Sequence, residues 1–275
     1  MIIILDMTAH RLPVDRPSFD TATAHFDELG RHLWEPIGAA TVAALALRPG
    51  ERVLDACCGT GASALPSARL VGPDGTVDAV DISDPMIDRL RRHASDLPQL
   101  RASSADVTTW EPSGYDVVQA VLGIFFFPDM AAGTDHLVSR ARVGGRVGLT
   151  VWRRGAMEAA GARLGRAVSE VLGTPPSGPP PSPPPARDIR TVEGFTDWLR
   201  DRGLHDVVVR VHEHRLPMTP DIAWLVVLGS GFRAALDPLD EEGIEAVRGR
   251  YLELLAEDDV TELDATTLVG TGSRR

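Results

Sequence analysis

Residues 53–64, VLDACCGTGASA, decide the fold class of this 275-residue chain. The stretch joins a predicted strand, Arg52 to Asp55, through the glycine turn Cys58 to Gly61 to a helix that we expect to end near Val71. Glycine lets the backbone approach a bound molecule closely and adopt positive φ, and the first turn of a helix offers unpaired N–H groups. Gly59-Thr60-Gly61-x-x-Ala64 also satisfies the pattern GxGxxA, so a dinucleotide-binding fold is a second interpretation.

The chain after residue 71 repeats this alternation of strands and helices. A turn at 73–75 leads to an apolar strand over 76–80, and a helix begins near Ser83 or Asp84. Further elements are expected as a short strand before Asp106, strands over 116–122 and 146–152, a helix through His136 and Arg142, and a turn at 143–145. The strands are apolar almost throughout, which predicts an α/β fold with a parallel sheet buried on both faces.

Helices are predicted before this region. Residues 16–47 carry apolar side chains at three- and four-residue spacings and predict two amphipathic helices broken near Pro36. We expect residues 1–15 to be disordered, and the sequence leaves open whether Met1 or Met7 is the start.

A proline-rich stretch follows a helix predicted over 157–172. Residues 174–187 hold eight prolines and predict a stiff polyproline II loop, interpreted as a spacer rather than as a segment that docks into a partner. The remainder predicts a helix over 191–202, a strand over 207–216, helices within 220–256 and a last strand over 265–270.

Composition excludes several classes of chemistry. All 28 basic residues are arginine, so no lysine is present to form a Schiff base or to bind phosphate in a Walker motif. With 39 acidic residues and a net charge of −11, the chain is a poor ligand for nucleic acid. The only cysteines, Cys57 and Cys58, are adjacent, which favours a reducing compartment, and we expect a cytoplasmic protein. No stretch approaches the roughly 18 apolar residues of a membrane span, so no membrane partner is expected.

Acidic residues recur where predicted strands end. Asp55 precedes Gly59 by four residues, Asp81 closes the next strand, and Asp106 follows a third, while ARVGG at 141–145 precedes a fifth. Together these residues resemble the class I S-adenosylmethionine-dependent methyltransferases, most closely the type 11 group that includes the ubiquinone and menaquinone biosynthesis enzymes. The resemblance covers residues 53–152.

The resemblance implies a Rossmann-like, seven-stranded, mostly parallel sheet with helices on both faces, plus N- and C-terminal helical cap elements. We therefore expect a single domain over 16–275, divided into a helical cap at 16–47, a cofactor-binding core at 50–173, the proline-rich loop at 174–187, and sheet completion with a substrate cap at 188–275.

The resemblance also implies a cofactor, S-adenosylmethionine, with S-adenosylhomocysteine as its product. The pattern that Asp55, Gly59 and Gly61 match surrounds the methionine end of the cofactor, and a carboxylate suits its ammonium group. The acidic residue that Asp81 matches accepts hydrogen bonds from both ribose hydroxyls. The remaining implied cofactor contacts are Ile82 and Met86 beside the adenine, Asp106 and Val107 at its amino edge, and backbone groups near Val121 at the ammonium. Cys57 and Cys58 are expected to pack below the cofactor.

The substrate side of the site is less defined. Phe19, Phe26, Trp34, Phe125 and Phe126 are candidates to line an apolar pocket, and core packing explains them equally well.

The catalytic base is not identified. His25, Asp27 and His32 are candidates, although a solvated helix face accounts for each. His212-x-His214 lacks a third ligand nearby, so no metal is expected.

Methyl transfer to a small, largely apolar or aromatic molecule, at oxygen, nitrogen or carbon, is the leading hypothesis. The lysine-free, Arg-, Ala- and Pro-rich composition is typical of a GC-rich genome, where such enzymes often tailor secondary metabolites, including antibiotics; a quinone is the nearest competing acceptor. The later helices carry enough apolar residues for a homodimer. The alternatives are an NAD-dependent oxidoreductase, which Asp55 beside a diphosphate disfavours, and a protein that binds S-adenosylmethionine without transferring methyl.

Overall fold

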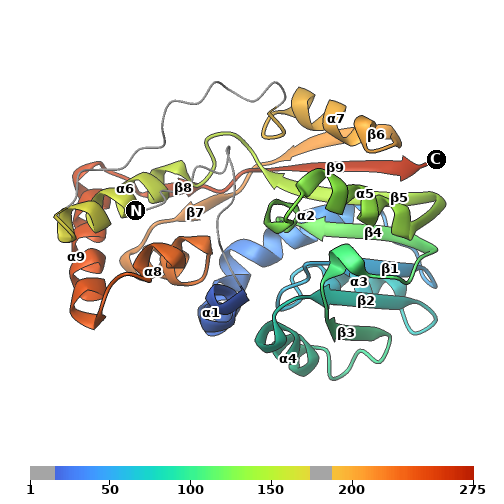
Figure 1. The fold of residues 1–275 in the computed structure, drawn as a ribbon, viewed down its shortest axis with the longest axis horizontal. Coiled ribbons are helices and arrows are strands. Elements are labelled where there is room, and N and C mark those ends of the chain that lie inside the picture. The colour runs from blue at the N-terminus through green and yellow to red at the C-terminus, as the bar shows by residue number, and fades with distance from the viewer. Residues whose placement is uncertain (1–15, 174–187) are drawn as a thin grey trace. The chain divides into compact units, whose positions relative to one another are not determined.

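The computed structural model describes residues 16–173 and 188–275, and the predictions for 1–15 and for the proline-rich stretch lie outside this part (Figure 1). The chain divides into two compact units. In the described part, the sheet unit comprises 30–154, 188–212 and 267–275, and the helical unit comprises 16–29, 155–173 and 213–266. The expected cap at 16–47 is thus shared between the units, and the single domain stays a prediction.

The sheet unit contains seven strands in the order β3-β2-β1-β4-β5-β9-β6. β1 pairs in parallel with β2 and β4, and parallel pairing continues to β3 and β5, whereas β9 runs antiparallel to β5 and β6. The strands are β1 (Arg52–Ala56), β2 (Thr76–Asp81), β3 (Leu100–Ser104), β4 (Tyr115–Val121), β5 (Ala141–Trp152), β6 (Leu204–His212) and β9 (Thr267–Arg274). The predicted seven-stranded, mostly parallel sheet is confirmed.

Two details of the strand prediction were wrong. The strand expected over 207–216 is divided into β6 and β7 (Arg215–Pro217), and β7 pairs with β8 (Glu262–Asp264) in a separate sheet. The turn expected at 143–145 lies within β5, where the pairing with β4 shifts register between Ala141 and Arg146. Gly144, with φ of +71°, adopts the left-handed conformation of this irregularity.

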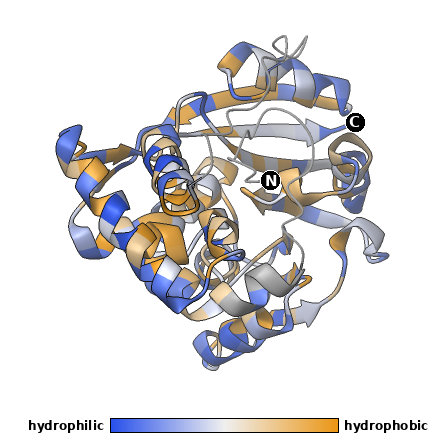
Figure 2. Ribbon diagram, turned by 60° about the vertical axis from the view of Figure 1, so that its left-hand side comes forward, coloured by the Kyte–Doolittle hydropathy of each residue, from blue (hydrophilic) through white to orange (hydrophobic). Residues whose placement is uncertain are grey.

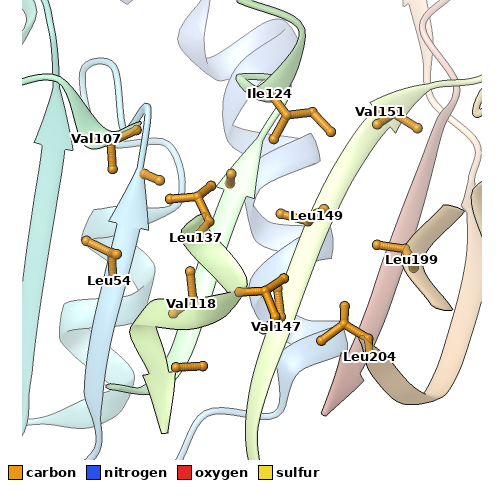
Figure 3. Close-up of a cluster of buried hydrophobic side chains, with 14 of the residues drawn as sticks. Leu54, Val107, Val118, Ile124, Leu137, Val147, Leu149, Val151, Leu199 and Leu204 are labelled. Carbon is orange, nitrogen blue, oxygen red and sulfur yellow. The ribbon is translucent and has the colours of Figure 1, made fainter. Parts of the chain in front are cut away.

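Both faces of the sheet are covered by helices, because alternate strand residues enter two different apolar clusters. Leu54 of β1 joins the cluster that includes Leu137 and Leu199 (Figure 3), whereas Val53 joins the cluster that includes Leu45 and Ala68. The helical elements of the sheet unit are η1 (Gly30–Trp34), α2 (Glu35–Leu45), α3 (Ala64–Val71), α4 (Asp84–His93), η2 (Val107–Thr109), η3 (Ile124–Phe126), α5 (Met130–Arg140) and α7 (Val192–Asp201). The break predicted near Pro36 was wrong: helical backbone continues through the π-helical η1 into α2, which carries Pro36 in its first turn.

The helical unit packs α1 on α8 and η4, and α6 on α9. On the outer side of the α6–α9 contact, Arg250 Nε lies 2.5 Å from Glu170. α9 buries Val247, Tyr251 and Leu254, which lie at four- and three-residue spacing on one face of the helix. Figure 2 shows that hydrophobic and hydrophilic residues are interspersed along the helices. The helices of this unit are α1 (Arg16–Leu29), α6 (Glu158–Val171), α8 (Pro220–Leu228), η4 (Gly231–Leu236) and α9 (Glu241–Glu257). In neither described segment is a helix long and apolar enough to cross a membrane.

Candidate functional site

The candidate site lies where the carboxyl ends of three parallel strands meet. β1 stands between β2 and β4, so the chain leaves β1 toward one neighbour and later returns to the other. Ligands of open α/β sheets bind outside the carboxyl ends of the strands at such a switch point. Asp55, Asp81 and Val121 each lie at or next to the end of one of these strands.

Asp55 is a fully buried carboxylate with one unsatisfied oxygen. Its Oδ2 accepts a hydrogen bond from Ser63 Oγ at 2.8 Å, while Oδ1 is buried and has no hydrogen-bond partner among the described residues. Burial raises the pKa of Asp55 from 3.8 to about 7, the charge of nearby Asp81 adds to the increase, and the hydrogen bond from Ser63 opposes it. A donor supplied by a ligand would remove the penalty of the unsatisfied oxygen.

Gln119 extends this buried network and was not identified from the sequence. It is the register partner of Asp55 on β4 and is fully buried. Its Nε2 donates to Ser67 Oγ at 2.9 Å, and within the described part its Oε1 accepts no hydrogen bond. The available signal was a polar residue inside the apolar run VVQAV, because a buried amide needs partners.

Asp81 is fixed against the glycine turn by two backbone donors. Its Oδ2 accepts from Gly59 N at 2.9 Å, and its Oδ1 accepts from Ser83 N at 3.0 Å. The carboxylate is therefore held in one orientation beside the glycine turn, at the carboxyl end of β2.

The glycine turn requires its glycines. Gly59 and Gly61 have φ of +52° and +108°. A Cβ on Gly61 would lie 2.5 Å from Leu90 Cδ1. The turn is anchored by a hydrogen bond from Cys58 N to Val80 O at 3.1 Å, so β1 and β2 hold it from both sides.

The segment after β3 adjoins Asp81. Ala105 N donates to Asp81 O at 2.9 Å, and the exposed Asp106 caps η2 by accepting from Thr108 N at 2.8 Å. Capping of η2 is therefore an alternative to a role of Asp106 at the adenine. Both hydrogen bonds from Thr108 are accepted by Oδ1 of Asp106. The other predicted adenine contacts differ in exposure: Ile82 is 46% exposed, Met86 is buried and Val107 is buried.

The phenylalanine run begins just beyond β4. Leu122 has φ of +54°, and its N–H donates to Thr150 O at 3.0 Å. Phe125 packs against the core cluster, whereas Phe126 is 42% exposed, and their rings meet edge to face at 6.4 Å. Phe126 is therefore the most exposed ring of the phenylalanine run.

The other predicted pocket and base residues are divided between the two units. Trp34 lies in the sheet unit, where its ring centroid is 6.4 Å from that of Trp152, a buried residue that the sequence did not single out. His32 also belongs to the sheet unit, whereas His25, Phe26 and Asp27 lie on α1 of the helical unit. The side chain of Phe19 lies outside the described part. These assignments stay predictions.

No metal site is apparent in the described ranges. His212 belongs to β6, and His214 lies in the helical unit. Across 16–173 and 188–275, no three His, Cys, Asp or Glu side chains gather in a group that could hold a metal ion.

Comparisons with known proteins decide the family. A family model described as a methyltransferase domain matches residues 53–145. Trans-aconitate 2-methyltransferase of Klebsiella pneumoniae (strain 342) is 30% identical over 210 residues, which cover 75% of this chain and 77% of that protein. The chain belongs to the class I S-adenosylmethionine-dependent methyltransferases.

Other methyltransferase relatives match a shorter part. Nocamycin O-methyltransferase of Saccharothrix syringae is 31% identical over 136 residues, covering 48% of this chain and 49% of that protein. Aklanonic acid methyltransferase DauC of Streptomyces sp. (strain C5) is 31% identical over 144 residues, which cover 50% of this chain and 66% of that protein. The chain thus spans about half to two thirds of the length of these curated relatives.

Solved structures support the methyltransferase fold. The [4+2]-cyclase SpnF superposes with a TM-score of 0.56 at 17% identity, covering 89% of this chain and 85% of that chain. YcgJ of Bacillus subtilis superposes with a TM-score of 0.54 at 13% identity, and the match covers 86% of this chain and 97% of that chain. At these identities the likeness concerns the fold alone.

The site fits S-adenosylmethionine, the cofactor of this methyltransferase family. An ammonium group would be a donor for Asp55 Oδ1, and a carboxylate such as Asp81 is the kind of acceptor that suits ribose hydroxyls. The pyrophosphate of NAD offers no donor to a buried carboxylate, so the dehydrogenase alternative fits less well.

Proposed function

We propose that the protein transfers the methyl group of S-adenosylmethionine to a small, largely apolar or aromatic molecule. The observation that carries the proposal is the buried Asp55 carboxylate, with one unsatisfied oxygen, at the switch point of a methyltransferase sheet. Such a carboxylate destabilises the free protein and suits a cationic ligand.

In the proposed site, Asp55 binds the cofactor ammonium together with backbone groups near Val121. Asp81 accepts hydrogen bonds from the ribose hydroxyls, and the backbone of the glycine turn approaches the cofactor without a Cβ at Gly59 or Gly61. The remaining proposed cofactor contacts are Cys58, Ile82, Met86, Asp106 and Val107.

The bound cofactor supplies an electrophilic methyl group, so the protein contributes mainly position and exclusion of water. Phe126, exposed just after β4, and Trp34 beside Trp152 are apolar surfaces of the sheet unit that suit a flat acceptor. Phe125 lies beside Phe126 and orients it. A base is needed only if the acceptor is not already nucleophilic, and His25, Asp27 and His32 are the proposed candidates.

The relatives support a small-molecule acceptor. Two of them are named for nocamycin and aklanonic acid, which agrees with an acceptor from secondary metabolism, including antibiotic biosynthesis. A third is named for trans-aconitate, so a small carboxylic acid is a second acceptor class. The exposed aromatic surface favours the first class.

Binding without methyl transfer is the alternative function. A [4+2]-cyclase shares this fold, and fold alone does not determine the reaction. The two free thiols agree with a proposed cytoplasmic location, and the acidic chain disfavours nucleic acid. A homodimer stays a prediction.

The first test is isothermal titration of the full chain with S-adenosylmethionine, S-adenosylhomocysteine and NAD. We expect micromolar binding of both sulfur nucleotides and none of NAD; the reverse pattern would overturn the proposal. Methyl transfer is then measured with [methyl-³H]S-adenosylmethionine against aromatic alcohols and small carboxylic acids. Tight cofactor binding without label transfer to either panel would favour the binding protein.

A further inference from the structure

Cys57 occupies a backbone conformation that side chains avoid. Its φ is +56°, in the left-handed region, directly after β1 and two residues before Gly59. A residue with a Cβ is strained there, so the surrounding structure must hold it in place.

The side chain of Cys57 fills the space beside Gly123. A Cβ on Gly123 would lie 2.8 Å from Cys57 Sγ and closer still to Cys57 Cβ. The two positions are therefore complementary: because residue 57 has a side chain, residue 123 must be glycine. Real Cβ atoms do not approach other atoms this closely, so a methyl group at 123 must displace one of the two segments.

Gly123 follows the sharp turn that ends β4. Leu122 has φ of +54° and is tied to β5 through its N–H, which donates to Thr150 O at 3.0 Å. Gly123 then leads into η3, which carries Phe125 and Phe126. The contact between Cys57 and Gly123 thus joins the end of β1 to the start of the phenylalanine run.

The same thiol lies among the acidic residues of the proposed cofactor site. Burial, followed by the charges of Asp81, Asp55 and Asp106, raises the pKa of Cys57 well above its usual value. Burial and the charges of Asp81 and Asp55 also raise the pKa of Cys58, whereas Asp106 is a cause only for Cys57. The Cys57 side chain is therefore neutral and acts here through its shape.

We propose that Cys57 is a positioning residue: its side chain, packed on Gly123, sets the path of residues 122–126 and so places the β4 end of the cofactor site. The inference rests on the proposed function, because it concerns the same cofactor. Simple core packing is the competing explanation, and it predicts an effect on folding stability without an effect on cofactor affinity.

A complementation experiment separates the two explanations. The variants are Gly123→Ala, Cys57→Gly, and the double variant C57G/G123A; Gly249→Ala, where nothing lies within 4 Å of the added methyl group, is the matched control. Each is measured for its dissociation constant for S-adenosylhomocysteine by calorimetry and for thermal unfolding without ligand.

We expect Gly123→Ala to weaken S-adenosylhomocysteine binding by about tenfold or more, the double variant to bind within about threefold of wild type, and Gly249→Ala to bind like wild type. Wild-type affinity in Gly123→Ala, or a double variant that recovers thermal stability but not affinity, would overturn the inference. If Gly123→Ala does not fold, Cys57→Ala and Cys57→Gly decide: the first keeps the Cβ and must bind like wild type, and the second must bind more weakly.

Failure of the inference is distinguishable from failure of the proposed function. Wild-type protein that binds neither S-adenosylmethionine nor S-adenosylhomocysteine would overturn both. Wild-type protein that binds them, with single-variant effects that simply add in the double variant, would overturn only the role of Cys57.

Discussion

Replacing Asp55 by Asn tests whether the buried carboxylate controls both stability and binding. Asn has nearly the same shape, keeps an acceptor for Ser63 Oγ and carries no charge. Because burial raises the pKa of Asp55 from 3.8 to about 7, the folded protein holds a proton that the unfolded chain loses at lower pH. The contribution of this group to stability is therefore greatest at low pH and is lost as the pH rises toward 7.

The magnitude follows from the difference between the two pKa values. Each pH unit well between the two pKa values is worth about 1.4 kcal/mol, so between pH 5 and 8 the wild type should lose about 2.5 kcal/mol relative to Asp55→Asn. Above about pH 8 the difference becomes constant. The free energy of unfolding is measured with urea at pH 5 and pH 8 for both proteins, and Asp88→Asn, which removes an exposed carboxylate, is the matched control.

Cofactor binding should show the opposite pH dependence. An ammonium group favours the ionised Asp55, so binding at pH 6 must release the proton that the free protein holds, and S-adenosylhomocysteine affinity should increase up to about tenfold per pH unit below 7. Calorimetry at pH 6 in two buffers of different ionisation enthalpy should detect this release in wild type and not in Asp55→Asn. A stability difference that is equal at pH 5 and 8, together with pH-independent affinity, would refute the reasoning.

Three further perturbations test neighbouring parts of the site. Asp81→Ala should weaken S-adenosylhomocysteine binding by about 1.5–3 kcal/mol, since charged hydrogen bonds are lost, and unchanged calorimetric affinity in a folded variant would contradict the ribose role. Phe126→Ala should raise the KM for the acceptor in the label-transfer assay while leaving the dissociation constant of S-adenosylhomocysteine unchanged; equal weakening of both would place the ring at the cofactor instead. Cys57 and Cys58 should react with iodoacetamide at pH 7.5 more slowly than free cysteine, because burial raises both pKa values, and mass spectrometry showing rapid modification of either would oppose this.

The central sheet was predictable because its signals are local. Glycines at 59 and 61 mark a turn that needs positive φ, and the apolar runs that precede Asp55 and Asp81 are typical of strands buried on both faces. The division of residues 207–216 between two sheets was missed: the polar stretch HEHR at 212–215 interrupts the apolar pattern there, but it does not reveal that the pairing partner changes from β9 to β8. Pairing over such distances depends on contacts that no short stretch encodes.

The candidate site was predictable in its residue types but not in its electrostatics. Spacing indicated that Asp55 and Asp81 lie near each other, yet nothing in the spacing distinguishes the buried carboxylate from the one held by backbone donors. That difference arises from tertiary neighbours, notably Gln119, which lies 64 positions beyond Asp55 and reaches it only through the pairing of β1 with β4. Gly123 was missed for the same reason. A side chain does not fit at position 123 because the Cys57 side chain fills that space, and the sequence alone does not show that the two residues meet.

Three features that are costly in the free protein lie at the carboxyl ends of β1 and β4. A buried carboxylate oxygen lacks a partner at Asp55, and two residues with side chains, Cys57 and Leu122, adopt left-handed φ within the same edge of the sheet. Each of these features opposes folding of the free protein. A cationic ligand that pairs with Asp55 removes the electrostatic part of this cost, so cofactor binding and stability of this edge must be coupled. The coupling between cofactor binding and stability depends on the charge of Asp55. It should therefore be strongest above pH 7, where Asp55 is ionised in the free protein.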